Sequence, residues 1–395
     1  MSERFETIDL VRGWALLGVA IINVHAMARG WTNHYALDLA DTWYDTLTEY
    51  VVGSFFAHRA FPSLAFLLGA GIALQWRALN ANSMLAPGAA LRVLRCRYAA
   101  LLLLGVCHGL LLWPGDIVSS YALIVLVLLW RWPKDSKGLL RWVRVLGALV
   151  ILVYALAVFG IATTAAQESP LSFPSFAYSP WSLALRMHPT EYFSYGLIQS
   201  TLPEVWFAIT LGVMIGQSGA LERWLRGEAI ARMWFAFGFA SFAIGTALEL
   251  ASSRLGAWDF TYPDGLGGAL FTLGLPLASV GSVFVLLALA RAWPTARARA
   301  VRETLIAAGK APLTMFFGMS MGLIPIFHAS FADWHAEMGR AAYTAVAVVM
   351  FALLAKFVSA WFAAGHARGP AELAWMRLAD ALSSRGGSLR DAPGA

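Results

Sequence analysis

Long apolar segments alternate with short polar ones along the whole chain. Ten of these segments are long enough, at roughly 20 residues each with allowance for tilt, to cross the hydrocarbon core of a membrane as helices. They cover residues 10–27, 51–75, 98–113, 117–132, 142–162, 196–216, 233–250, 266–290, 305–327 and 342–364. The pattern predicts an all-α polytopic membrane protein, with a single transmembrane domain over residues 1–382 and a short flexible cytoplasmic tail over 383–395.

The composition agrees with this class, because 59% of the residues are hydrophobic and only 13% are charged. The two cysteines, Cys96 and Cys107, fall at different depths of the third apolar segment and its approach. Their spacing predicts neither a disulfide nor a metal site. We therefore expect no metal in this protein.

Basic residues predict the orientation of the chain, since Lys and Arg in short loops stay on the cytoplasmic side of a membrane. With the N-terminus inside, 23 of the 29 Lys and Arg residues fall on the cytoplasmic side. Both termini are therefore expected in the cytoplasm. The net charge of +6 follows from this bias, because basic loops face anionic lipid headgroups. It gives no reason to expect a nucleic-acid partner.

Two short sequences predict how neighbouring helices pack. Trp113-Pro114-Gly115-Asp116 is a turn sequence between the third and fourth apolar segments, and it predicts a tight antiparallel hairpin. Gly69-Ala70-Gly71, in the second segment, is typical of membrane helices whose backbones approach closely.

The connection over residues 29–50 has the spacing of an amphipathic helix. Its acidic residues recur every three or four positions, with apolar residues between them, which predicts a helix lying at the membrane interface. These residues are Asp38, Asp41, Asp45 and Glu49. We interpret them as a solvated acidic face rather than a ligand site.

An arginine inside the first apolar segment is the most unusual charge in the chain. Arg12 stands in the run from Leu10 to Met27, where charge is expensive and is usually kept for function. Asp9 precedes it by three residues on the same helical face, so one interpretation is an ion pair that anchors the helix. The other is a site for a cytosolic anion, such as a nucleotide phosphate, which a guanidinium can bind through two nitrogens.

Most other ionisable groups at membrane depth fall on the outer side of the predicted topology, and His108 lies in the outer half of the third segment. Asp116 follows just across the hairpin turn. Five residues of helix from His108 to Trp113 rise about 7.5 Å, so the Asp116 carboxylate could reach the imidazole directly or through water. A carboxylate that orients an imidazole is the usual arrangement of a general base. The alternative is a buried histidine satisfied by a neighbouring helix, with Asp116 capping the fourth helix.

Five spaced motifs in this order resemble the YeiB-like family of bacterial inner-membrane proteins. They are Ile8 to Gly13 with Leu17-Gly18 and Asn23; Arg59 to Gly71; Gly105-Val106-Cys107-His108-Gly109 with Gly115-Asp116-Ile117 and Tyr121-Ala122-Leu123; Gly309 to Thr314; and Gly369-Pro370-Ala371-Glu372 before Trp375. The resemblance runs almost from end to end. It departs locally, because the family often has lysine where Arg59 stands.

The resemblance implies a place in the wider transmembrane acyltransferase group, which includes heparan glucosaminide acetyltransferase and glucan-succinylating proteins. Members are thought to carry an acyl group from cytosolic acyl-CoA to a sugar hydroxyl or amine on the far side of the membrane, using a membrane histidine. It therefore implies a multi-pass enzyme of the bacterial inner membrane. Acyl-CoA, in the simplest case acetyl-CoA, would be the co-substrate. The acceptor would be an extracytoplasmic saccharide or other small molecule, and a homo-oligomer is compatible with this activity.

On this hypothesis each polar residue at membrane depth has an expected role. His108 acts as general base or transiently carries the acyl group, Asp116 orients it, and Arg59 binds the acceptor or stabilises an oxyanion. Arg12 and Lys310 contact the CoA phosphates. Acceptor binding is expected from Asn23, His25 and His58.

Two other functions use the same residues differently. A small-solute transporter or channel would use the histidine and carboxylates as a proton relay. Discontinuous helices with charge at the membrane midplane would favour that function, whereas this chain places its charges nearer the outer face. A structural subunit without chemistry would leave Arg59 and His108 replaceable by apolar residues.

Overall fold

The computed structural model describes residues 3–29, 42–81, 88–132, 136–163, 178–226, 228, 232–254, 265–293, 298–334 and 338–385. Every regular element among these residues is a helix, so the all-α prediction is confirmed. The helices are α1 (Glu3–Arg29), α2 (Trp43–Phe55), α3 (Ala60–Asn80), α4 (Ala89–Leu111), α5 (Val118–Trp130), α6 (Ser136–Thr163), α7 (Trp181–Glu191), the π-helix η3 (Tyr192–Gly196), α8 (Leu197–Ser200), α9 (Pro203–Gln217), α10 (Ala220–Leu225), α11 (Arg232–Arg254), α12 (Gly265–Ala292), α13 (Arg299–Lys310), α14 (Pro312–Phe327), α15 (Arg340–Ala363) and α16 (Pro370–Arg385).

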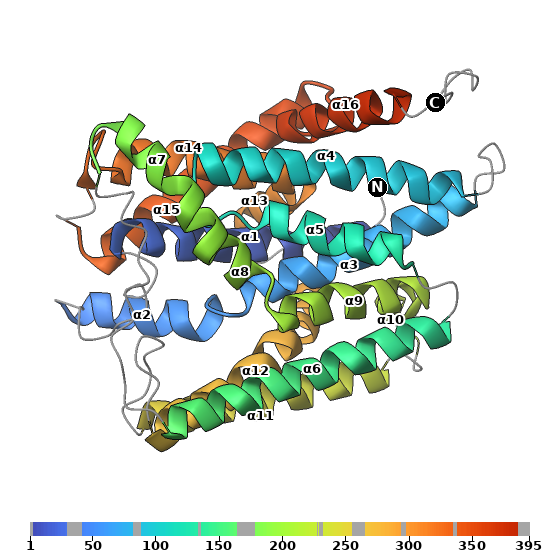
Figure 1. The fold of residues 1–395 in the computed structure, drawn as a ribbon, viewed down its shortest axis with the longest axis horizontal. Helices are drawn as coiled ribbons and strands as arrows, with labels where there is room; N and C mark the ends of the chain where they lie inside the picture. Colours follow the sequence, from blue (N-terminus) through green and yellow to red (C-terminus); the bar gives the residue numbers. More distant parts are fainter. Residues whose placement is uncertain are drawn as a thin grey trace.

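The long helices run side by side in one bundle, with α4 and α16 toward one edge and α6, α11 and α12 toward the other (Figure 1). Six helical segments of the described residues are long and apolar enough to cross a membrane, or seven if the bent pair α13 and α14 counts as one. The protein is therefore a polytopic membrane protein, and the full number of ten crossings stays a prediction. The predicted tail begins inside α16, which continues to Arg385, and residues 386–395 lie outside the described part of the chain.

Three of the predicted segments are broken in the structure. The segment 51–75 is interrupted between α2 and α3, where His58 has a positive φ of 54°. The segment 196–216 restarts at Pro203, and the segment 305–327 bends by 99° between α13 and α14, where Pro312 begins the new helix. Proline explains the last two breaks, because it lacks an N–H and disfavours a helical residue before it. Apolar periodicity alone does not register such breaks.

Helix α1 lies in the middle of the bundle and packs against α3, α13, α14 and α15. Its side chains are accordingly buried on most sides, with Ala15 and Val24 fully enclosed. By contrast, α6 exposes a row of large apolar side chains, including Ile151 and Phe159 at 72% and 68% exposure. Such a face suits lipid as its surroundings. The polar residues of α1 are therefore held inside protein rather than against lipid.

The acidic residues of α2 correct the prediction made for residues 29–50. Asp45 and Glu49 are buried rather than solvated, and both face α15. Arg340 donates to the Glu49 carboxylate, and the backbone N–H of Ala341 donates to Asp45 Oδ1 at 2.8 Å. The outward face of α2 is apolar instead, with Trp43 76% exposed. Charged side chains are costly in lipid, so a helix surrounded by lipid turns them toward the interior of the bundle. Asp38 and Asp41 lie outside the described residues.

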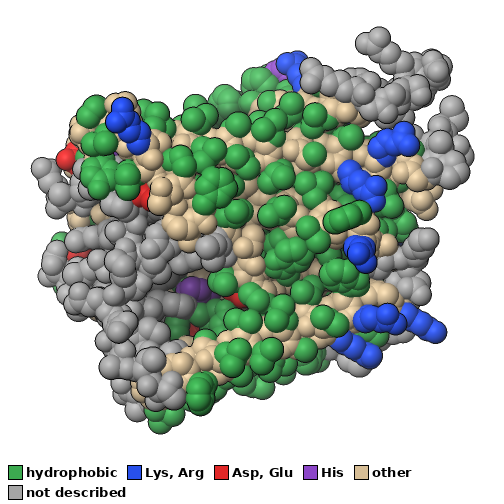
Figure 2. Space-filling view, viewed as in Figure 1, with side chains coloured by type: hydrophobic (Ala, Val, Ile, Leu, Met, Phe, Trp, Pro, Cys, Tyr) green, Lys and Arg blue, Asp and Glu red, His purple; other side chains and the backbone are tan. Residues whose placement is uncertain are grey.

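The predicted orientation has a visible counterpart on the surface. The start of α1 and the end of α16 lie toward the same end of the bundle. On the face shown in Figure 2, most Lys and Arg side chains gather toward that end, where α4 begins and α9 ends. This asymmetry is the one that the positive-inside rule describes.

The orientation can be tested with two fusions. A reporter placed at Ser136, at the start of α6, is expected on the cytoplasmic side, and one at Ser179, just before α7, on the opposite side. Paired alkaline phosphatase and fluorescent-protein fusions measure both. A periplasmic signal at Ser136 or a cytoplasmic signal at Ser179 would show that the orientation is wrong.

Candidate active site

The hairpin of α4 and α5 brings His108 and Asp116 into direct contact. His108 lies in the last turn of α4, and Asp116 stands just before α5. The imidazole Nδ1 is 2.8 Å from Asp116 Oδ1, and both side chains are buried, Asp116 completely. The contact expected from the turn sequence is thus present. The catalytic role of the two residues stays a prediction.

The second oxygen of Asp116 is also fully used. Oδ2 accepts the backbone N–H of Ser119 at 2.7 Å and the Ser119 hydroxyl at 2.6 Å. Tyr192 in turn donates its hydroxyl to Ser119 Oγ at 2.8 Å. Asp116 therefore hydrogen-bonds both to His108 and to the first residues of α5, so the contacts that each interpretation requires are present. A carboxylate held at both oxygens cannot rotate away from the imidazole.

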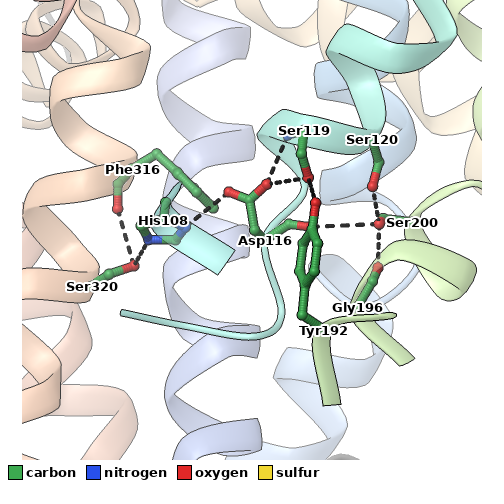
Figure 3. Close-up of polar contacts among 9 residues, drawn as sticks. All are labelled: His108, Asp116, Ser119, Ser120, Tyr192, Gly196, Ser200, Phe316 and Ser320. Atoms are coloured by element: carbon green, nitrogen blue, oxygen red, sulfur yellow. Dashed lines mark hydrogen bonds and ion pairs between the residues drawn. The ribbon is translucent and has the colours of Figure 1, made fainter. Parts of the chain in front are cut away.

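The other ring nitrogen of His108 faces a serine from a distant part of the chain. His108 Nε2 is 2.9 Å from Ser320 Oγ, on α14 (Figure 3). An ionised carboxylate only accepts, so with the ring proton on Nδ1 toward Asp116, Nε2 is able to accept the Ser320 hydroxyl. The Ser320 hydroxyl also lies 3.5 Å from the Phe316 carbonyl. Phe317 stacks on the ring at a centroid distance of 4.9 Å and helps to fix its plane. Asp116, His108 and Ser320 therefore lie in one hydrogen-bonded series, with the imidazole between the carboxylate and the hydroxyl.

Ser320 opens into a small pocket between α1, α14 and α15. The pocket has room for about one water molecule. Its walls are apolar except at two residues, Ser320 and Asn23. Asn23 is buried, and its Oδ1 has no hydrogen-bond partner among the described residues. A buried amide oxygen without a hydrogen bond costs free energy unless a water or a ligand donates to it. The pocket is therefore bordered by the Ser320 hydroxyl and by the Asn23 side chain, whose Oδ1 has no hydrogen-bond partner among the described residues.

The residues around the hairpin hold the histidine in place. Tyr192 packs over Gly109, where an added Cβ would lie 2.4 Å from the tyrosine ring, so no larger residue fits after His108. His188, on α7 and outside the candidate spans, approaches the Leu110 carbonyl at 3.2 Å through Nδ1. Burial lowers the pKa of His188 to about 4, so this histidine is neutral at pH 7. The end of α4 is therefore packed by an aromatic ring and an uncharged imidazole.

The structure places Arg59 in a separate cluster. Its Nη2 is 2.5 Å from Glu249 Oε2, and its Nη1 donates to the carbonyls of Gly53 and Ala57 at 3.2 and 3.1 Å. Both members of this ion pair are buried. The guanidinium therefore already holds an anion, the carboxylate of α11. An acceptor-binding or oxyanion role for Arg59 stays a prediction.

The three residues expected to bind an acceptor separate in the structure. Only Asn23 lines the pocket beside Ser320. His25 is buried beside α15, with Nε2 2.7 Å from Thr344 Oγ1 and Nδ1 3.9 Å from Glu49 Oε2. His58 stands in the turn between α2 and α3.

The residues expected to hold a CoA phosphate lie at the basic end of α1. Arg12 Nη1 is 2.9 Å from Asp9 Oδ1, which confirms the ion pair, and donates to the Gly309 carbonyl at 3.1 Å. The exposed Lys310 follows directly at the end of α13. Helix rise places Asn23 about 16 Å further along α1 from Arg12. Helix α1 therefore connects the expected phosphate-binding end at Arg12 with the pocket at Asn23.

Ser320 is the functional candidate that sequence reasoning missed. Its only signal is a lone hydroxyl in the apolar run Met319-Ser320-Met321, which is also common in packed membrane helices. Among the described residues, no group of three or more His, Cys, Asp or Glu could hold a metal ion.

Comparisons with known proteins agree with the resemblance seen in the motifs. Residues 215–381 match the family described as "Protein of unknown function (DUF418)". The chain is 27% identical to the uncharacterized protein YeiB of Escherichia coli over 270 residues, 64% of this chain and 65% of YeiB. It is 28% identical to the uncharacterized protein YxaH of Bacillus subtilis over 169 residues, 40% of each chain. The chain thus spans less than two thirds of each relative's length, and the likeness to the YeiB-like family is confirmed.

Proposed function

We propose that this YeiB-like membrane protein is an acyltransferase of the bacterial inner membrane. It would move an acyl group, in the simplest case acetyl, from cytosolic acyl-CoA to a hydroxyl or amine of an extracytoplasmic acceptor, which we expect to be a saccharide. The observation that carries the proposal is the buried line of Asp116, His108 and Ser320 beside a pocket. An oriented imidazole facing a hydroxyl in a site without bulk water is built to take a proton from oxygen.

Each polar group of the line has a distinct task in acyl transfer. His108 takes a proton at Nε2, and Asp116 stabilises the imidazolium that forms. The charge on the acyl oxygen grows at the same time, and the side-chain amide of Asn23 is the pocket group able to donate to it. Both effects are larger in a buried site, because water does not screen them.

The acyl donor would enter from the basic end of α1. Arg12 and Lys310 supply positive charge there for the CoA phosphates. The pantetheine arm would then follow α1 toward the pocket, along the stretch of about 16 Å between Arg12 and Asn23. Donor and acceptor would thus reach the same pocket from opposite ends of the bundle.

The test of this function is a search for product with purified protein. Acetyl-CoA and candidate saccharides are incubated with the protein in detergent, and both the released CoA thiol and the acetylated product are measured. Product formation that depends on the folded protein supports the proposal. Acyl-CoA that neither binds nor turns over with any acceptor argues against it.

The donor end makes a separate prediction. Replacing Arg12 with Lys keeps the charge but removes the planar fork that can hold phosphate through two nitrogens, so we expect acyl-CoA to bind about tenfold more weakly. Isothermal calorimetry on the purified proteins measures the change. Arg141→Lys, at an exposed position of α6, is the matched control and should bind as the parent does. Equal affinity of Arg12→Lys and the parent for acyl-CoA would mean that Arg12 does not bind the CoA phosphates.

A proton-coupled transporter is the second candidate, because one observation favours it. Hydrogen bonds run without a gap from Tyr192 through Ser119 and Asp116 to His108 and Ser320, as a proton relay requires. The bend between α13 and α14 lies beside Lys310, at the basic end, rather than at the middle of the bundle. Acyl transfer makes a covalent product in detergent, where no gradient exists, whereas transport does not. The product assay therefore separates the two functions.

A further inference from the structure

We propose that Ser320 is the nucleophile of this site and carries the acyl group as an O-acyl-serine between donor and acceptor. The inference rests on the proposed function and deepens it, because it assigns the covalent intermediate to one atom. It replaces a histidine-bound acyl group with a serine ester.

The hydrogen-bond geometry is that of an activated serine. Asp116 Oδ1 is 2.8 Å from Nδ1 of His108, and Nε2 of the same ring is 2.9 Å from Ser320 Oγ. A nucleophile within hydrogen-bond reach of a base, with the base oriented by a third group, is the signature of nucleophilic catalysis. The three residues come from α4, the hairpin turn and α14, so only the fold brings them together.

Because both ring nitrogens of His108 already have hydrogen-bond partners, Ser320 is better placed than His108 to carry the acyl group. Both ring nitrogens of His108 are engaged, Nδ1 by Asp116 and Nε2 by Ser320. An acyl group on Nε2 would displace the Ser320 hydroxyl and leave no base for the second step. An acyl group on Ser320 Oγ leaves the imidazole free to serve both steps.

The surroundings of Ser320 suit an ester that must survive until an acceptor arrives. The side chain is 2% exposed and borders the narrow pocket. Three methionines, Met27, Met315 and Met319, line the same pocket and can repack to admit an acyl chain. Because the serine is buried and the pocket has room for only about one water, the ester is shielded from bulk water.

Acyl transfer through Ser320 takes two steps, and each step returns its proton. Ser320 Oγ attacks the thioester carbonyl, its proton moves to His108 Nε2, the carbon–sulfur bond breaks, and the CoA thiolate leaves with the proton from His108. The acceptor hydroxyl then attacks the serine ester and gives its proton to Nε2. The bond between the carbonyl carbon and Ser320 Oγ breaks, and Ser320 takes the proton back. No redox partner or further reactant is needed.

A fluorophosphonate probe tests the nucleophile without any CoA. An activated serine displaces fluoride from this probe, and the labelled peptide is identified by mass spectrometry. We expect labelling at Ser320 in the parent, none at that position in Ser320→Ala, and at least a hundredfold slower labelling in His108→Ala. Ser279→Ala, a change at another buried serine on α12, should label as the parent does. A folded parent that is not labelled at Ser320 would overturn the inference.

A second experiment traps the intermediate itself. The parent is incubated with acetyl-CoA without acceptor, and the peptide containing Ser320 should gain one acetyl group, which acceptor then removes. Ser320→Cys keeps a nucleophile of similar size, so it should carry a thioester that neutral hydroxylamine cleaves, even if Ser320→Ala folds poorly. Acyl transfer that persists in Ser320→Ala overturns the acyl-serine but leaves the acyltransferase intact. Probe labelling at Ser320 without turnover of any acyl-CoA supports the nucleophile and overturns the CoA-dependent function.

Discussion

Replacing His108 with Ala should reduce acyl transfer by roughly 10²- to 10⁴-fold, the usual contribution of a general base. The fold should survive, because Asp116 Oδ2 keeps both of its hydrogen bonds from Ser119 when the imidazole is gone. Oδ1 loses its contact with His108, which should cost about 1–3 kcal/mol of stability. Turnover of acetyl-CoA with the acceptor in detergent measures the loss, and size-exclusion chromatography measures the folded yield.

Asp116→Asn should lower the rate nearly as much by a different route. The asparagine amide can donate to Nδ1 of His108, which would move the ring proton to Nε2, and a protonated Nε2 cannot accept from Ser320. Because base and orienting acid act as one unit, the double mutant should be no worse than His108→Ala alone.

The matched control is His366→Ala. His366 is exposed and stacks on Trp361 at 3.9 Å between ring centroids, near the end of α15. This variant should keep full activity. Full activity in His108→Ala would remove the histidine from the mechanism, and strictly additive losses for His108 and Asp116 would mean that Asp116 acts on another group.

Local sequence was enough to predict the contact between base and acid. His108 and Asp116 are eight positions apart and are joined by a turn whose proline and glycine force the reversal. Asp9 and Arg12 pair for a similar reason, at three positions on one helix. In both pairs the short chain between the two residues keeps them within reach of each other, so spacing was enough to suggest the contact.

Contacts between distant segments could not be predicted in this way. Ser320 is 212 positions from His108, and only the tertiary fold shows that the two side chains are in contact. Glu49 was expected in water, because the sequence does not show that Arg340, 291 positions away, lies opposite it. A single sequence specifies which residues are costly in lipid, and the tertiary fold decides which partner removes the cost.

The motif Gly69-Ala70-Gly71 offers the sharpest test of the packing, because its two glycines should respond oppositely to the same change. At Gly69 an added Cβ would lie 2.0 Å from the backbone oxygen of Ile209 on α9, and backbone cannot move aside as a side chain can. At Gly71 an added Cβ would meet nothing within 4 Å. Gly69 is thus the glycine that the close approach of α3 and α9 requires.

Gly69→Ala should therefore force α3 and α9 apart and destabilise the protein by about 3 kcal/mol, the upper end of the usual cost of overpacking. Gly71→Ala should leave the stability unchanged or raise it by up to about 1 kcal/mol, because alanine is the better helix former. Thermal unfolding in detergent compares the two variants with the parent. A melting temperature in Gly69→Ala equal to that of the parent would contradict the close crossing. Equal losses in both variants would mean that glycine is needed for the helix backbone itself and not for the contact with α9.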